Sequence, residues 1–199
     1  MGFEGVGQVA AIILSRPQVV VVLLLGSALL VPLASSWARW LGWSAARATY
    51  AALAGIGLAL VLATTLARWS PELVLSLGRR CLTDSGGSLD SPEAWLNLVL
   101  FGPVAFFGVL AVRRLLAVGV GLAALSAAIE AVQLVTGAGI CQTADLQRNV
   151  AGIVVAAVTA RLLVATGDVL TSGRDDPAPG HDPTSAHRDE PARTAPAAR

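Results

Sequence analysis

The sequence predicts an all-α protein: a polytopic membrane helix bundle with five transmembrane helices. The composition is the first reason, since 55% of the 199 residues are hydrophobic and 14% are charged, whereas about 25% of a soluble domain is charged. The second reason is that the charges are separated by long uncharged runs. A charge at the centre of a bilayer is energetically costly, so charged residues mark the ends of membrane segments. A water-soluble monomer is excluded.

Five runs are long enough to cross about 30 Å of hydrocarbon as helices that rise about 1.5 Å per residue. In chain order they are residues 17–38, 48–67, 94–112, 115–135 and 147–165. The fourth run is interrupted by Glu130 alone, and the fifth carries Arg161 near its far end. We therefore predict a membrane domain over residues 17–166.

Both ends of the chain are predicted to lie outside this bundle. Residues 1–16 are apolar but too short to span alone once Pro17 interrupts them, so we expect an interfacial segment. This segment does not resemble a cleaved signal peptide, because no basic region precedes it. Residues 167–199 are rich in Pro, Ala, Arg and Asp and cannot bury a core, so we expect a disordered tail.

The charge balance and the metal-ligand types exclude other classes of protein. All 14 basic residues are arginines and they face 13 acids, which leaves no basic surface for nucleic acid. Cys81 and Cys141 lack the spacing of a zinc module, and the two histidines, His181 and His187, both fall in the predicted tail. We expect no metal and no cofactor, and the lipid bilayer as the main partner.

Arginines in the short loops predict the orientation. The first loop carries Arg39 and Arg47 and the third carries Arg113 and Arg114, which favours a cell-membrane protein with the N-terminus outside and the tail in the cytoplasm. The bias is slight, because the opposite face carries arginines too.

The two cysteines fall on one membrane face if the chain has five spans. Cys81 lies in the second loop and Cys141 in the fourth. If this face is extracellular, the redox compartment permits a disulfide between them. The alternative is two unrelated free thiols.

Polar and small residues repeat at helical spacing in the last three predicted helices. In the fourth, Ser126, Glu130 and Gln133 are spaced by four and three residues, which places them on one face of the helix. The same kind of spacing joins Asp145, Asn149, Gly152 and Ala156 in the fifth helix and Asn97, Phe101, Val104 and Gly108 in the third. Chain direction places Asn97, Glu130, Gln133, Asp145 and Asn149 toward one membrane face, where they can meet.

Two interpretations of these polar residues stay open. Glu130 lies roughly 8 Å inside its segment, where polar groups usually face the bundle interior. They either clamp the helices together or form a ligand-binding cleft open to the outside. In such a cleft Glu130 and Asp145 are the acid–base or ligand-orienting groups, and Asn97, Gln133 and Asn149 are hydrogen-bond donors.

Three segments resemble the VanZ-like family of bacterial membrane proteins, and together they cover about residues 95–163. They are N-x-x-x-F-x-P from Asn97, S-x-x-I-E-x-x-Q from Ser126 and D-x-x-x-N-x-x-G from Asp145. The sequence departs from the family pattern at Val104 and Ala105, where Leu-Gly is frequent, and at residues 141–143, where an arginine is frequent. The family is named for a protein associated with low-level resistance to teicoplanin-type glycopeptides.

The resemblance implies a role in the bacterial cell envelope. Under this hypothesis the polar site recognises a cell-wall or lipid-linked amphiphile, such as a lipid-linked glycan or a lipoglycopeptide. One alternative is an intramembrane enzyme with Glu130 or Asp145 as general acid or base; Ser126 is near, but the bundle offers no His or Lys to activate it. A second alternative is a structural or assembly subunit of an envelope complex.

Overall fold

The structure is a computed structural model, and it describes residues 7–8, 11–12, 15–66, 81, 89, 91–136 and 141–172. The chain forms two compact units, Met1–Ala165 and Thr166–Arg199. Most of the expected interfacial segment over residues 1–16 lies outside the described residues, and so does the expected disordered tail beyond residue 172. The last described helix, which begins at Thr143, continues to Ser172, past the expected end of the membrane domain at residue 166.

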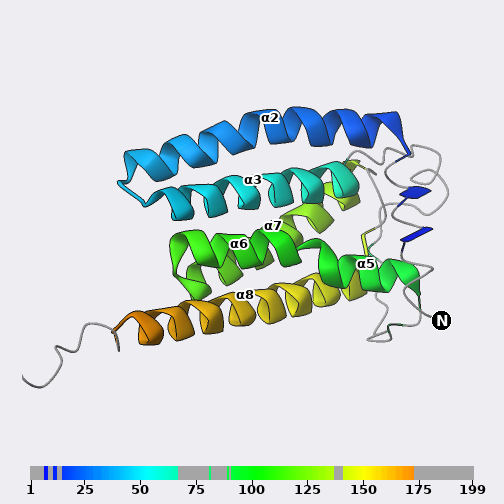
Figure 1. The fold of residues 1–199 in the computed structure, drawn as a ribbon. Coiled ribbons are helices and arrows are strands. Elements are labelled where there is room, and N and C mark those ends of the chain that lie inside the picture. Colours follow the sequence, from blue (N-terminus) through cyan, green and yellow to red (C-terminus); the bar gives the residue numbers. More distant parts are fainter. Residues whose placement is uncertain are drawn as a thin grey trace, which may run out of the picture. The chain divides into compact units, whose positions relative to one another are not determined.

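The described part of the chain is built from helices (Figure 1). They are α2 (Pro17–Trp40), α3 (Ala45–Leu66), α5 (Pro92–Leu100), α6 (Gly102–Val112), α7 (Leu115–Thr136) and α8 (Thr143–Ser172). Five stretches are long and apolar enough to cross a membrane, and α5 and α6 together form the third. The predicted all-α fold with five membrane-spanning segments is confirmed.

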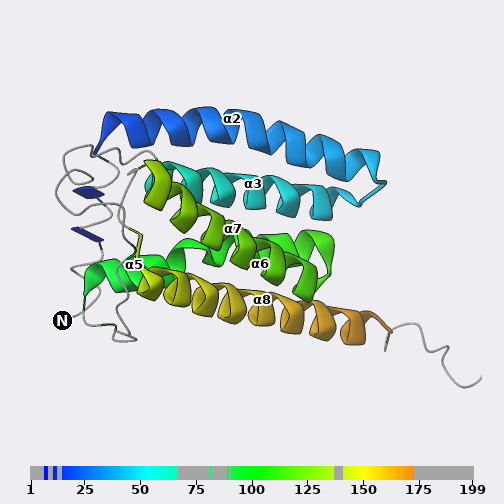
Figure 2. The same ribbon diagram turned by 180° about the vertical axis from the view of Figure 1, so that it is seen from behind.

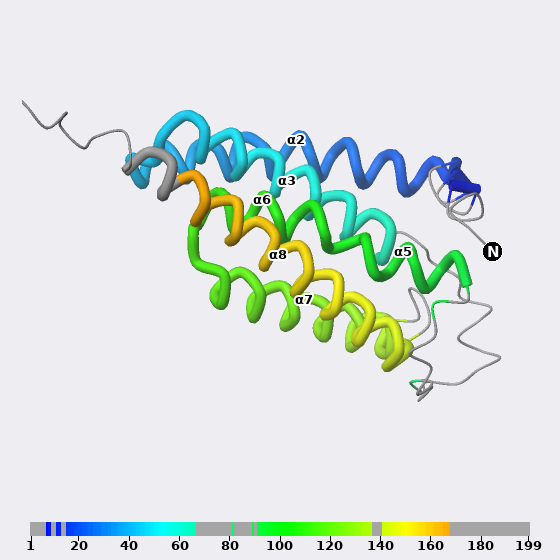
Figure 3. The backbone as a smooth tube through the Cα atoms, turned by 60° about the horizontal axis from the view of Figure 1, so that its bottom comes forward, coloured from blue at the N-terminus to red at the C-terminus, as the bar shows by residue number. Residues whose placement is uncertain are grey.

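Within the first unit the helices run side by side and reverse direction from one span to the next (Figures 1 and 2). At one end, which we name the polar end, lie the last turns of α3 and α7 and the first turns of α5 and α8. At the other, which we name the arginine end, lie the α2–α3 and α6–α7 turns, and α6 lies next to α3 in the tube view (Figure 3).

Glycines set the closest helix approaches. A Cβ added to Gly57 on α3 would lie 2.9 Å from the backbone nitrogen of Val104 on α6. A Cβ added to Gly152 on α8 would collide with the carbonyl group of Leu98 on α5, whose carbon is 2.9 Å away. Such contacts between backbones are typical of membrane helices. They bring α3, α5, α6 and α8 together around a buried core that includes Val61, Phe101, Val104, Ile129 and Ile153.

The uncharged run over residues 94–112 predicted one continuous helix for the third span, but the structure shows two helices there. The span divides at Phe101, which ends α5 and begins α6. Pro103 occupies the first turn of α6, where its missing N–H is not needed and its fixed φ angle suits a helix start. Ser91 caps α5, since its hydroxyl accepts a hydrogen bond from the Ala94 N–H at 3.2 Å. Phe101 is fully buried, so the break lies inside the bundle.

Candidate functional site

Two hydrogen bonds define how α7 and α8 lie against each other at the polar end. The Asn149 Nδ2 donates to the Ser126 Oγ at 3.0 Å, and the backbone N–H of Gln142 donates to a carboxylate oxygen of Glu130 at 2.9 Å. On α7, Glu130 lies one helical turn closer to the polar end than Ser126. On α8, Asp145 lies one turn closer to the polar end than Asn149. The two carboxylates therefore lie at about the same level, close enough for their charges to interact.

Glu130 is bound at the start of α8. The Gln142 carbonyl accepts from the N–H groups of Asp145 and Leu146, at 3.2 and 3.4 Å, so Gln142 belongs to the first turn of the helix. A carboxylate there is stabilised by the unpaired N–H groups and the positive end of the helix dipole. The membrane-embedded acid is thus held by backbone, and no ion pair joins it to another described residue.

A disulfide adjoins this contact. Cys141, next to Gln142, is buried and bonded to Cys81, with the two Cα atoms 4.6 Å apart, within the range that disulfides adopt. Two neighbouring residues just before α8 are consequently held in place, Cys141 by the disulfide to Cys81 and Gln142 by the hydrogen bond to Glu130.

In two buried amide side chains, Gln133 and Asn149, the nitrogen forms a hydrogen bond but the oxygen accepts none from a described residue. The Gln133 Nε2 donates to the Thr65 carbonyl at the end of α3, at 3.3 Å. Gln133 and Asn149 are 8% and 5% exposed, yet the Gln133 Oε1 and the Asn149 Oδ1 have no hydrogen-bond partner in the described part of the chain. An unpaired buried acceptor costs about 1–3 kcal/mol. Within the described residues, the bundle therefore holds two buried amide oxygens that accept no hydrogen bond.

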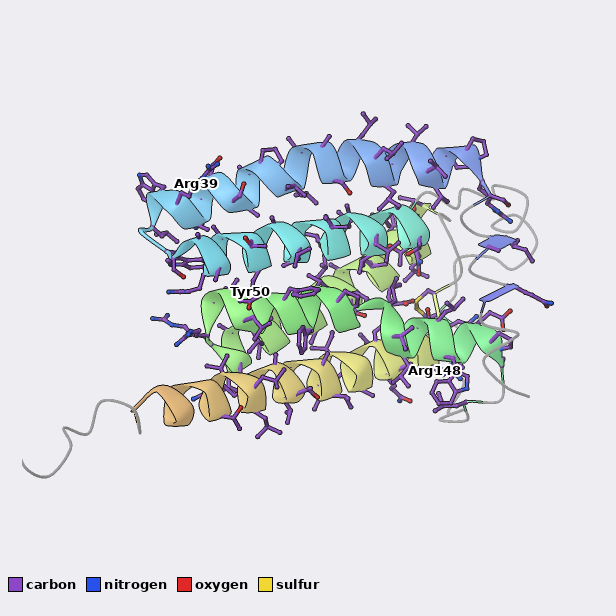
Figure 4. All side chains as sticks on the ribbon, viewed as in Figure 1. Arg39, Tyr50 and Arg148 are labelled. Atoms are coloured by element: carbon purple, nitrogen blue, oxygen red, sulfur yellow. A yellow bond between two sulfur atoms is a disulfide. The ribbon has the colours of Figure 1, made fainter. Side chains whose placement is uncertain are left out.

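Asp145 is paired, unlike Glu130. The Arg148 guanidinium lies 3.1 Å from its carboxylate, one turn along α8. Figure 4 shows Arg148 on the first part of α8, toward the end of the bundle opposite Arg39. The described contacts therefore bring two carboxyl groups, from Glu130 and Asp145, and one guanidinium, from Arg148, into this region.

The structure unites four of the five predicted site residues on two neighbouring helices. We name Ser126, Glu130, Gln133, Asp145 and Asn149 the polar cluster. Asn97 is half-buried on α5, and no hydrogen bond links its side chain to another described residue. Its neighbour Leu98 contacts α8 at Gly152, so Asn97 lies beside α8 but takes no part in the hydrogen bonds of the polar cluster.

Three participants were absent from the predicted site: the Thr65 carbonyl, the Gln142 N–H and the Arg148 side chain. Arg148 follows Asp145 by three residues, and this spacing is a recognisable signal for an ion pair on a helix. The two backbone groups have no sequence signal, because every residue carries a carbonyl and almost every residue an N–H.

The described geometry gives Ser126 a packing role. Its side chain is fully buried and its hydroxyl oxygen accepts from Asn149. A serine nucleophile needs a base within hydrogen-bond reach and access to substrate. Neither the neutral amide nor the burial supplies these, so the contact supports binding or packing rather than covalent catalysis.

The comparisons with known proteins agree with the motifs. The family model described as VanZ/LLP1 matches residues 18–164. This match extends from the first turn of α2 into α8 and covers most or all of each of the five membrane-spanning segments, well beyond the 95–163 stretch that carries the motifs. No curated protein and no solved structure matches the chain. The chain is a multi-pass membrane protein, and it belongs to the VanZ/LLP1 family.

Proposed function

We propose that this VanZ-like protein acts in the bacterial cell envelope by binding the polar part of an amphiphile at its polar cluster. The amphiphile is a lipid-linked glycan or a lipoglycopeptide, and binding links the protein to glycopeptide tolerance. The observation that carries the proposal is the pair of buried acceptor oxygens, the Gln133 Oε1 and the Asn149 Oδ1, for which the described part of the chain provides no donor. A purely structural helix clamp has no use for unpaired acceptors.

The chemistry of the cluster favours a ligand rich in hydrogen-bond donors. Carboxylate and amide oxygens accept only, and here they come from Glu130, Gln133, Asp145 and Asn149. The two carboxyl groups of the cluster disfavour an anionic group and suit hydroxyls or an ammonium group. Sugar hydroxyls and amino groups on a glycan or a glycopeptide meet this requirement, while the apolar part of the same molecule stays in the lipid.

The distribution of charge supports a location of the polar end outside the cell. In the first unit the described carboxylates, Glu93, Glu130 and Asp145, all belong to the polar end. The arginine end carries Arg39, Arg47, Arg113, Arg114 and Arg161. Arginines concentrate in cytoplasmic loops, and disulfides persist in oxidising compartments. Although Arg16 and Arg148 lie at the polar end, both rules favour an orientation with the N-terminus and the polar cluster outside and the tail in the cytoplasm.

Tolerance measurements on a strain that lacks the chromosomal copy test the proposal. Glu130→Gln removes the negative charge but retains an oxygen that can accept from the Gln142 N–H. We expect this variant to lose tolerance to a teicoplanin-type lipoglycopeptide while its membrane level and melting temperature stay near those of the wild type. Glu93→Gln is the matched control, because Glu93 is exposed on the first turn of α5.

Wild-type tolerance in the Glu130→Gln strain at equal protein level would refute the proposal. Equal loss in the Glu130→Gln and Glu93→Gln strains would refute it as well, because it would assign the effect to surface charge and not to the polar cluster.

A further inference from the structure

The arginine end gathers positive charge around one small packing cluster. Ala38 on α2, Ala48 on α3 and Ala111 on α6 are buried against one another. Arg39 and Arg47 are next to Ala38 and Ala48 in the sequence, and Arg113 and Arg114 follow Ala111 by two and three residues. The described carboxylates of the first unit belong to the polar end, and Arg39, Arg47 and Arg114 form no ion pair with a described residue.

Arg47 is held in a fixed position within this group. Its Nε donates to the Ala111 carbonyl at 2.7 Å, and its guanidinium carbon lies 4.2 Å from the centre of the Trp43 ring, a cation–π contact. Neither contact uses the two terminal Nη groups, for which the described residues provide no partner. A guanidinium presented in this way matches the oxygens of a phosphate.

The α2–α3 turn explains why Trp43 lies beneath Arg47. The N–H groups of Trp43 and Gly42 donate to the carbonyls of Ala38 and Arg39, at 3.0 and 2.9 Å, which is a Schellman ending for α2. Gly42 has the required positive φ of +70°. The aromatic ring and the guanidinium are therefore positioned by the backbone before any ligand arrives, which reduces the entropy lost on binding.

Two further features place this group at the level of lipid headgroups. Trp37 and Trp40, on the last turns of α2, are 60% and 76% exposed, and exposed tryptophans of membrane proteins concentrate at the interface between hydrocarbon and water. Arg113 ends α6 in the left-handed conformation, with a φ of 61°, so the chain reverses there and leaves Arg113 and Arg114 in an exposed turn.

We propose that Arg47, together with Arg39 and Arg114, binds the phosphate of an anionic phospholipid at the arginine end. The Nη groups of Arg47 donate to the phosphate oxygens, and the other arginines add attraction. The acyl chains lie along the apolar side of α2, where Leu29 and Leu33 are exposed. This lipid site lies at the opposite end of the bundle from the polar cluster and does not depend on what that cluster binds.

Native mass spectrometry of the purified full-length protein tests the lipid site. We expect the wild type to retain phosphatidylglycerol in preference to phosphatidylcholine with the same acyl chains. Arg47→Gln should weaken phosphatidylglycerol binding about fivefold, the equivalent of about 1 kcal/mol for one basic residue at a membrane surface. Arg47→Lys should bind phosphatidylglycerol with intermediate affinity, because lysine keeps the positive charge but lacks the paired N–H groups of the guanidinium. Arg16→Gln, which removes an exposed arginine near the polar end, should bind like the wild type.

A second variant allows the lipid site to be tested even if Arg47→Gln does not fold. The double variant Arg39→Gln/Arg114→Gln changes two exposed arginines and leaves the Arg47 contacts with Ala111 and Trp43 in place, and it should lose at least fivefold in affinity. Excess glycerol phosphate is added to distinguish lipid from free phosphate, and it should not displace the lipid.

Three results would overturn the proposal. The first is equal retention of phosphatidylglycerol and phosphatidylcholine by the wild type. The second is undiminished phosphatidylglycerol binding by the double variant. The third is displacement by glycerol phosphate, which would make a soluble phosphate the ligand.

Discussion

The carboxylate of Glu130 on α7 accepts a hydrogen bond from the backbone N–H of Gln142, next to the disulfide-bonded Cys141. An acid inside a membrane segment is costly unless it is paired or hydrogen-bonded, and here the start of α8 supplies the partner. Because the disulfide and Glu130 hold the same short connection, the position of the acid depends on both. The polar cluster and the disulfide are therefore one structural unit.

Loss of the disulfide should destabilise the polar end. The link closes a loop with a sequence separation of 60, and a loop of this length corresponds to roughly 4 kcal/mol of unfolding free energy in the chain-entropy estimate. The double variant Cys81→Ser/Cys141→Ser should melt at a lower temperature than the wild type in detergent. Non-reducing gels of the wild type should show a mobility change on reduction. Free alkylation of both thiols without reductant would contradict the disulfide.

Gly152→Ala should disrupt the contact between α5 and α8. The added methyl group would overlap the Leu98 carbonyl, and overpacking of this kind costs about 1–3 kcal/mol. Gly121→Ala on α7 is the matched control, since a Cβ there meets nothing within 4 Å. Thermal unfolding in detergent measures both variants. Equal melting temperatures for the two would show that the helices do not approach as closely at Gly152.

The Ser126–Asn149 hydrogen bond should produce a measurable coupling. Hydrogen bonds between membrane helices average about 0.6 kcal/mol in double-mutant cycles. A cycle of Ser126→Ala, Asn149→Ala and the double variant, followed by unfolding in mixed micelles, should give a coupling free energy of this size. Strictly additive effects would indicate that the two side chains do not interact.

Accessibility to an impermeant maleimide tests the orientation. In a background where both native cysteines are serine, Arg16→Cys lies near the polar end and Ser44→Cys at the arginine end; both positions are exposed. We expect intact cells to label Arg16→Cys, and only permeabilised cells to label Ser44→Cys. The opposite pattern, or a C-terminal tail accessible from outside, would reverse the proposed topology.

The spans and part of the site could be predicted from the sequence because simple rules govern them. Uncharged length determines where a helix can cross a bilayer, and spacing of three and four residues selected Ser126, Glu130 and Gln133 on α7, all of which form hydrogen bonds to other parts of the bundle. The same rule predicted that Asn97 and Val104 lie on one face of a single helix, but the helix breaks at Phe101. The 3.6-residue period therefore does not continue from Asn97 to Val104. The partners of Glu130 and Gln133 are backbone groups, whose positions depend on tertiary packing.

A binding measurement tests the central claim most directly. It compares the affinities of the wild type and of Gln133→Leu, both purified in nanodiscs, for a teicoplanin-type lipoglycopeptide. The leucine removes the unpaired Oε1 and one interhelical hydrogen bond, so stability should change by less than about 1 kcal/mol. If the polar cluster is the binding site, the wild type binds and Gln133→Leu binds at least about tenfold more weakly, a difference of about 1.4 kcal/mol. Equal affinity of the two proteins, or no binding by the wild type, would contradict the account.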